Sequence, residues 1–228
     1  MLISLHMPKT AGSSFLQALE THFGEGLQKD YSDMARIQQY LAGDLLPQEV
    51  IERGIVEFDS SHPPTCIHGH FLPAKFLTLT SAGKCEMKFI TWLRDPVERL
   101  FSHYHYFMRS YDPSTAGPLF RKIVEDKWSL ETFCFSEEYK NFYSKYLWNF
   151  PYDRFDFVGL TEFYEDDLRQ FSERFLKTEA KAYRMNCAVE SKIAGHRIDP
   201  GFRREVENFH SEDVALYNRA LQEREQRV

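Results

Sequence analysis

Four short apolar segments are spaced along the chain as the strands of an α/β domain would be, at residues 2–6, 65–68, 87–93 and 155–160. Residues 87–93 are apolar at most successive positions, which is typical of a central parallel strand buried on both faces. Helical segments separate the four strands. The pattern therefore predicts an α/β fold with a central, mostly parallel sheet flanked by helices.

Apolar residues recur at helical spacing after the first, third and fourth of these segments. The strongest signal follows residue 93, where Asp95 is placed to cap a helix that begins at Pro96. Shorter helices are expected within residues 30–53, and a terminal helix is expected from Ser211. Residues 112–150 contain turn signals and many aromatic residues, and we predict a helical insertion there, within one domain spanning residues 1–228.

Charge and hydropathy restrict the classes of function. The chain has 34 acidic and 28 basic residues and a formal net charge of -6, so it lacks the basic balance of a nucleic-acid-binding protein. An anionic ligand would need a local cationic site. The apolar stretches are too short for a membrane span and the opening segment does not resemble a leader, which favours a soluble, cytoplasmic protein.

Three of the predicted strands deliver polar residues to the same edge of the sheet. The first leads into Lys9, the second into His68 and His70, and the third into Arg94. In parallel α/β sheets, ligands bind beyond the carboxyl ends of the strands. This edge is therefore the candidate functional site.

The segment after the first strand contains Lys9 and five small residues, namely Thr10, Ala11, Gly12, Ser13 and Ser14. Backbone N–H groups at a strand-to-helix turn attract anions, small residues let a phosphate approach, and Lys9 adds a mobile cation. The order differs from that of a Walker A loop, in which the lysine follows the glycines. For this segment alone, an ordinary strand-to-helix turn with a serine N-cap is as good an explanation as an anion site.

The other two segments supply candidates for phosphate binding and proton transfer. Arg94 can bind a phosphate through two parallel N–H bonds, and Ser102 can add a hydroxyl; an ion pair and a surface serine are the structural alternatives. His68 and His70 are alternate residues of an extended segment, and either imidazole can accept a hydroxyl proton. No further ligands accompany them at a familiar metal spacing, so no metal site is predicted.

Together these segments resemble the PAPS-dependent sulfotransferases, most closely the carbohydrate branch typified by heparan sulfate 2-O-sulfotransferase. Four pieces carry the resemblance in family order: HMPKTAGSSF at residues 6–15, HGH at 68–70, FITWLRDPVERLFS at 89–102 and FVGLTE at 157–162. The Arg-Asp-Pro-x-x-Arg stretch after a strand is the most specific of them.

This resemblance implies a P-loop-like, three-layer fold and transfer of a sulfuryl group from PAPS (3′-phosphoadenosine 5′-phosphosulfate) to an acceptor hydroxyl, with no metal. Lys9 would contact the bridging oxygen, and the loop from Thr10 to Ser14 would surround the 5′-phosphate. Arg94 and Ser102 would hold the 3′-phosphate, and His70 would be the base, with His68 as its neighbour. Lys192 lies where the family folds a loop over the nucleotide and is a candidate nucleotide contact.

The acceptor is expected to be a saccharide or glycoconjugate rather than a tyrosine. Two other functions stay open: a P-loop-type kinase acting on ATP, and a non-catalytic module that binds a nucleotide or a glycan. Candidates for the acceptor cleft lie in the predicted insertion and at the end of the helix before it, although a solvated helical face explains most of them: Tyr106, Arg109, Tyr111, Arg121 and Lys122.

Overall fold

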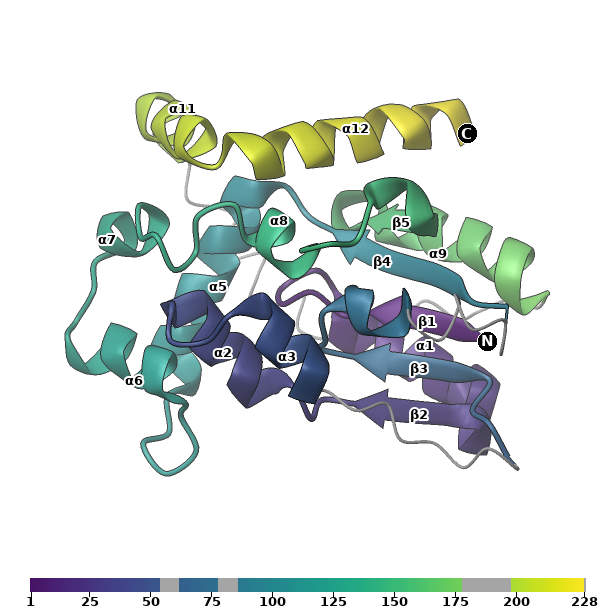
Figure 1. Ribbon diagram of the computed structural model, residues 1–228. Coiled ribbons are helices and arrows are strands. Elements are labelled where there is room, and N and C mark those ends of the chain that lie inside the picture. The colour runs from purple at the N-terminus through teal and green to yellow at the C-terminus, as the bar shows by residue number, and fades with distance from the viewer. Residues whose placement is uncertain (54–61, 78–85, 178–197, 228) are drawn as a thin grey trace.

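The computed structural model describes residues 1–53, 62–77, 86–177 and 198–227 (Figure 1). Its centre is a five-stranded sheet in the order β2-β3-β1-β4-β5. The strands are β1 (Leu2–Leu5), β2 (Leu27–Asp30), β3 (Cys66–Gly69), β4 (Lys88–Leu93) and β5 (Phe155–Leu160). All four neighbouring pairs are parallel, so every strand ends at the same edge.

Helices cover both faces of this sheet. On one face, α1 (Gly12–Phe23), α9 (Tyr164–Phe171) and the π-helical turn η5 (Ser172–Leu176) pack on the strand residues Leu2, Ile90, Trp92 and Phe157. On the other face, the alternate strand residues Ile3, Leu5, Phe89 and Leu93 belong to a larger cluster. The predicted α/β fold with a parallel sheet between two helical layers is confirmed.

The larger cluster is completed by several short helices and by the last helix of the chain. These elements are α2 (Met34–Ala42), α3 (Pro47–Arg53), η2 (Pro73–Phe76), α5 (Pro96–Ser110), α6 (Pro118–Glu125), α7 (Leu130–Cys134), α8 (Phe142–Tyr146), α11 (Pro200–Phe209) and α12 (Ser211–Arg227). The predicted helical insertion at residues 112–150 contains α6, α7 and α8. Three further 3-10 turns are η1 (Gly24–Gly26), η3 (Tyr152–Arg154) and η4 (Thr161–Phe163).

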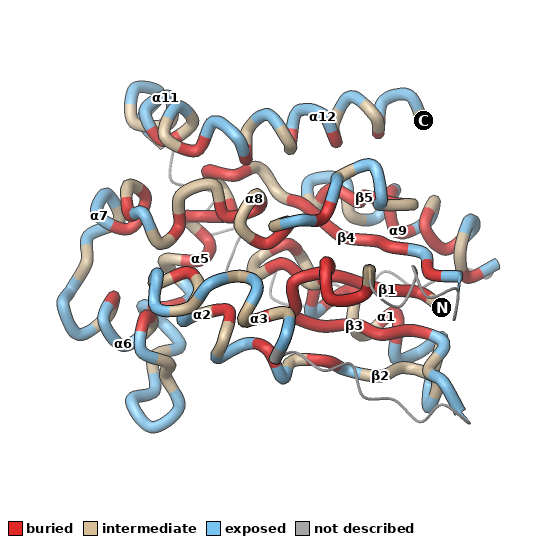
Figure 2. The backbone as a smooth tube through the Cα atoms, in the orientation of Figure 1, coloured by how far each residue is buried: buried red, intermediate tan, exposed pale blue. Residues whose placement is uncertain are grey.

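Burial follows this layering. Figure 2 shows β1, β3 and β4 buried over most of their length, while the outer sides of α6, α11 and α12 are exposed. No helix in the described part of the chain combines the length and apolar character needed to cross a bilayer.

Helix α5 begins as the sequence predicts. Asp95 is the N-cap, and its side chain accepts a hydrogen bond from the backbone N–H of Glu98 at 3.0 Å, while Pro96 occupies the first turn. The cap fixes the direction in which the chain leaves β4. Among the strands and α-helices, strand β2 and helix α11 were not predicted.

Candidate active site

A cleft of about 630 Å³ opens beyond the carboxyl ends of the strands. Its floor is the segment that joins β1 to α1, together with His6 and His70. Its sides include residues from α2 and the aromatic wall, which we define as Tyr106, Phe107, Phe120, Tyr139, Phe142 and Tyr146. Residues 161–166, which follow β5, complete the lining.

The loop that joins β1 to α1 has an unusual backbone conformation. Lys9 and Ala11 both have positive φ values, of 70° and 61°. Thr10 lies between them, and its buried hydroxyl donates to the carbonyl oxygen of Met7 at 2.8 Å. Left-handed residues in a turn direct successive N–H groups towards one side, which creates an anion-binding concavity.

Helix α1 adds to this concavity. It begins at Gly12, and no side chain caps its N-terminus. The first N–H groups of a helix have no acceptor within the helix itself, and the helix dipole favours a negative charge at this end. Ala11, Gly12, Ser13 and Ser14 line the cleft beside Lys9, whereas Thr10 of the same predicted segment does not.

Gly12 is required by a close approach of the backbone to His6. A Cβ atom on residue 12 would overlap the His6 imidazole. His6 also lines the cleft, although the sequence analysis did not select it as a site residue. Its position directly after β1, at the edge where the other site residues gather, is the signal that could have identified it.

Three imidazoles pack against one another at and beneath the floor. The ring centroids of His6 and His70 are 4.2 Å apart, those of His6 and His68 are 5.1 Å apart, and both pairs are stacked at 25°. Tyr31, just after β2, contacts all three rings at their edges, and its hydroxyl lies 3.3 Å from Nδ1 of His6. Burial, followed by repulsion from the other two histidines and Lys9, lowers the pKa of His6 well below its usual value.

The hydrogen bonding of His70 defines its tautomer. Nδ1 contacts the backbone carbonyl oxygen of His6, and a carbonyl oxygen only accepts, so Nδ1 carries the proton. Nε2 of the neutral ring then holds a lone pair. Burial lowers the pKa of His70 to about 4, so the ring is neutral at pH 7.

His68 lies deeper. It is fully buried on β3, its Nδ1 is 2.7 Å from the hydroxyl of Ser4, and it does not line the cleft. Burial lowers its pKa to about 3. Of the two histidines, His70 is therefore the one with access to a ligand in the cleft, and His68 supports the stack from behind.

Arg94 and Ser102 do not line this cleft. The backbone of Arg94 is fixed by Tyr143, whose hydroxyl accepts from its N–H at 3.0 Å and donates to its carbonyl oxygen at 2.7 Å. The next residue, Asp95, donates its backbone N–H to the cleft-lining Glu162 at 2.8 Å, and desolvation raises the pKa of Glu162. Ser102 is buried on α5, and Lys192 lies outside the described residues.

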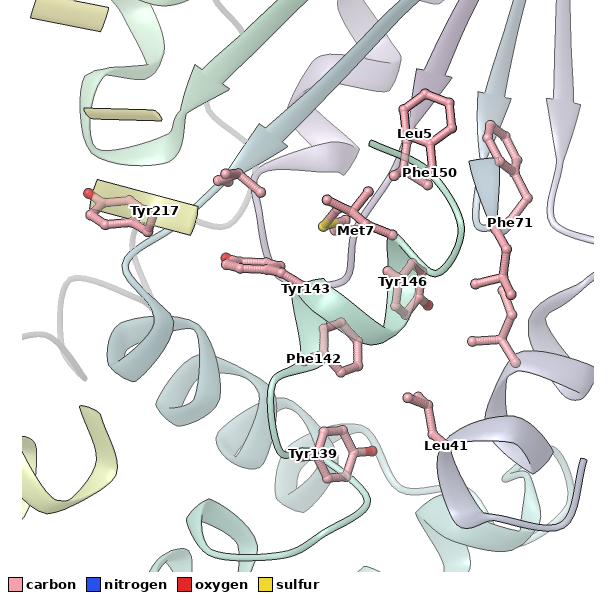
Figure 3. Packing of buried hydrophobic residues seen from close by; sticks show 14 of the residues in the cluster. Leu5, Met7, Leu41, Phe71, Tyr139, Phe142, Tyr143, Tyr146, Phe150 and Tyr217 are labelled. Carbon is pink, nitrogen blue, oxygen red and sulfur yellow. The ribbon is translucent and has the colours of Figure 1, made fainter. Parts of the chain in front are cut away.

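The hydrogen bonds between Tyr143 and Arg94 are connected, through Tyr143, to the last helix. Asp213 of α12 accepts hydrogen bonds from the backbone N–H groups of Tyr143 and Ser144, at 2.9 and 3.3 Å. Figure 3 shows Tyr143 among the buried side chains near the carboxyl edge of the sheet. Helix α12 thus helps to fix the residue that follows β4.

The acceptor-cleft candidates separate into two groups. Tyr106 lines the cleft, and Nζ of Lys9 lies 4.8 Å from the centroid of its ring. Arg109, Tyr111, Arg121 and Lys122 are not among the lining residues. In the described part of the chain, no group of three His, Cys, Asp or Glu side chains is arranged to hold a metal ion.

Comparisons with known proteins give similarity at the level of structure only. No protein-family model matches the chain, and no curated protein matches its sequence. The crystal structure of a sulfotransferase from Alicyclobacillus acidocaldarius is 17% identical, with 94% of this chain and 92% of that chain covered and a TM-score of 0.48. Mouse sulfotransferase SULT7A1 complexed with PAP is 12% identical, with 92% and 64% covered and a TM-score of 0.34.

Proposed function

We propose that the protein transfers a sulfuryl group from PAPS to a hydroxyl group on a carbohydrate. The main support is the arrangement of His70. Its ring has an unprotonated Nε2, and the residue lines the same cleft as Lys9 and the anion-binding loop. A base and a cation beside an anion site are the groups that transfer of an anionic group to a hydroxyl needs. The sequence motifs around the same residues support the choice of PAPS.

The chain offers suitable groups for each end of the donor. The N–H groups of the loop from Lys9 to Ser14, with the start of α1, suit the 5′-phosphosulfate end. Arg94 and Ser102 are proposed to hold the 3′-phosphate, with Arg94 kept in place by Tyr143. The cleft volume lies within the range of small-molecule sites. PAPS would supply the activated sulfuryl group and leave as PAP.

Two residues carry the proposed chemistry. Nε2 of His70 accepts the proton of the acceptor hydroxyl, which is typically worth about 100- to 10,000-fold in rate. Nζ of Lys9 donates a hydrogen bond to the leaving oxygen as negative charge builds there, and the loss of one such preorganised donor typically costs about 100- to 1000-fold. The stacked His6 and the buried His68 hold the ring of His70 in place.

Binding and transfer assays test the proposal together. We expect PAP to bind without magnesium and Lys9→Ala and His70→Asn each to lose most transfer of radiolabelled sulfate to saccharide acceptors. Lys29→Ala is the matched control, because Lys29 is exposed and pairs with Glu20 away from the cleft. Full transfer activity in Lys9→Ala would contradict the mechanism.

The same assays separate the two rival functions. Magnesium-dependent binding of ATP in preference to PAP would favour the kinase. Tight PAP binding without transfer to any hydroxyl acceptor would favour a non-catalytic binding module.

A further inference from the structure

The aromatic wall meets the floor of the cleft at the proposed reacting groups. Lys9 approaches the ring of Tyr106, and His103, which also lines the cleft, packs against Phe107 with ring centroids 4.5 Å apart. Met34, Ile37 and Leu41 from α2 line the same cleft. Figure 3 shows Leu41 on one side of this space and Tyr139, Phe142 and Tyr146 on the other. An acceptor that reaches His70 therefore lies on apolar and aromatic surface.

The charges along the cleft do not suit a polyanionic acceptor. Among the lining residues that the structure describes, Lys9 is the one Lys or Arg, while Glu162, Glu165 and Asp166 are acidic. Binding of a sulfated or uronate-rich chain depends on repeated cationic contacts, and like charges along its path repel it. Lys9 is itself committed to the donor in the proposed mechanism.

The apolar side also contains polar atoms that lack a partner. Oε1 of Gln38 and Nδ1 of His103 are buried and have no hydrogen-bond partner among the described residues, and both side chains belong to the cleft lining. Buried polar atoms are normally hydrogen-bonded. Neutral polar side chains such as Gln38 and His103 suit the hydroxyl groups of a sugar, whereas a pure hydrocarbon offers them no hydrogen bond.

We infer that the acceptor is an uncharged glycoside with an apolar alkyl or aryl group, bound with its sugar hydroxyls near His70, Gln38 and His103 and its apolar group against the aromatic wall and α2. This inference rests on the proposed sulfuryl transfer and narrows its acceptor. The faces of aromatic rings suit both sugar C–H groups and a hydrocarbon chain, and each buried methylene adds affinity.

Matched acceptors test the apolar part of this inference. Octyl and methyl glycosides of glucose, galactose and mannose carry the same sugar hydroxyls and no charge, and a glucuronate-containing polysaccharide carries many charges. With PAP bound and below the micelle concentration, calorimetry should give a dissociation constant at least about tenfold lower for the best octyl glycoside than for its methyl counterpart. Transfer assays should give the same order of preference.

Variants of Met34 test where the octyl glycoside binds. Met34 lines the cleft and is exposed, so Met34→Lys places a charge on the apolar side without burying it in the core. It should weaken octyl glycoside binding at least about tenfold without weakening PAP binding. Met34→Leu is the matched control, and Leu46→Lys tests a charge at an exposed site outside the cleft.

The outcomes distinguish this inference from the proposed function. Equal binding of octyl and methyl glycosides, preference for the polysaccharide, or octyl binding unaffected by Met34→Lys would overturn the inference, even where PAP binds and sulfate is transferred. Absence of PAP binding by the unmodified protein would instead contradict the proposed function itself.

Discussion

The backbone of Gly12 lies so close to the imidazole of His6 that a Cβ atom on residue 12 would overlap the ring. The carbonyl oxygen of His6 in turn accepts the hydrogen bond from Nδ1 of His70. The first turn of α1, the end of β1 and the proposed base are therefore held together through His6.

Gly12→Ala should displace the ring of His6 and with it His70. We expect a loss of sulfuryl transfer of about 100-fold, as for other small displacements of reacting groups, and a decrease in unfolding free energy of about 1–3 kcal/mol from overpacking. Transfer assays and urea unfolding measure both. In the Gly12→Ala/His6→Ala double variant, the stability loss caused by overlap should be relieved; additive losses would show that the overlap is not its cause.

The pH dependence of transfer should reflect the low pKa of His70. Burial lowers this pKa to about 4, and the base acts only when neutral. We therefore expect the acidic limb of the kcat/KM profile to be centred near pH 4 instead of near 6.5. If the acidic limb stays near pH 4 in His70→Asn, the titrating group is not His70.

The same pKa shift predicts how folding stability depends on pH. The folded-state pKa of His70 lies below the unfolded value of about 6.5, so its neutral burial stabilises the fold most above pH 6.5. This contribution is lost as the pH falls from about 6.5 to about 4, because only the unfolded state binds the proton in that window. Urea unfolding at several pH values should show a shallower decline for His70→Asn.

Removal of the Arg94 side chain tests the proposed second phosphate contact. Arg94→Ala should weaken PAP binding by about 10- to 100-fold, the usual value of hydrogen bonds to a charged group. Tyr143→Phe leaves the guanidinium but removes both hydrogen bonds to the Arg94 backbone, so its effect on PAP should be smaller. Unchanged PAP affinity in Arg94→Ala, measured by calorimetry, would contradict this role.

A buried ion-pair network flanks Tyr31, whose ring contacts the three histidines. Nζ of Lys75 lies 2.6 Å from Asp30 and 2.7 Å from Asp33, on either side of Tyr31 in the sequence. Lys75→Met would remove the cationic partner of the buried Asp30, while Asp33 keeps its ion pair with Arg36 at 2.6 Å, and should lower the unfolding free energy by about 3–5 kcal/mol. Lys75→Met/Asp30→Asn/Asp33→Asn should recover part of this loss in thermal unfolding. If it does not, the loss arises from packing rather than charge.

Much of the fold could be predicted because burial and local signals agree. The apolar strands β1, β3, β4 and β5 were predicted close to their observed positions. Strand β2 was not, since Leu27-Gln28-Lys29-Asp30 contains one apolar residue and forms the edge of the sheet, where one side of the strand has no neighbour. Helix α11 begins with Asp199 as N-cap and Pro200 after it, the same signal that identified α5, and could have been predicted.

Long-range contacts limited the prediction of the site. Lys9, Gly12 and His70 were identified from local motifs, whereas the stacking of His6 on His70 depends on the pairing of β1 with β3. The buried side of α12 includes Asp213 and Arg224, which an apolar stripe does not indicate. Their burial is explained by partners far away in the sequence, such as Asp167 for Arg224 at 2.7 Å.

The positive φ angles of Lys9 and Ala11 have a consequence for the kinetics of ligand capture. Residues other than glycine adopt this conformation at a cost of about 1–2 kcal/mol each. In this protein the folded chain already holds both residues in it before any anion binds. The amides of the turn need no rearrangement on contact. Encounter by diffusion should therefore limit association at this turn, and differences in affinity among variants should arise mainly in how fast the anion departs.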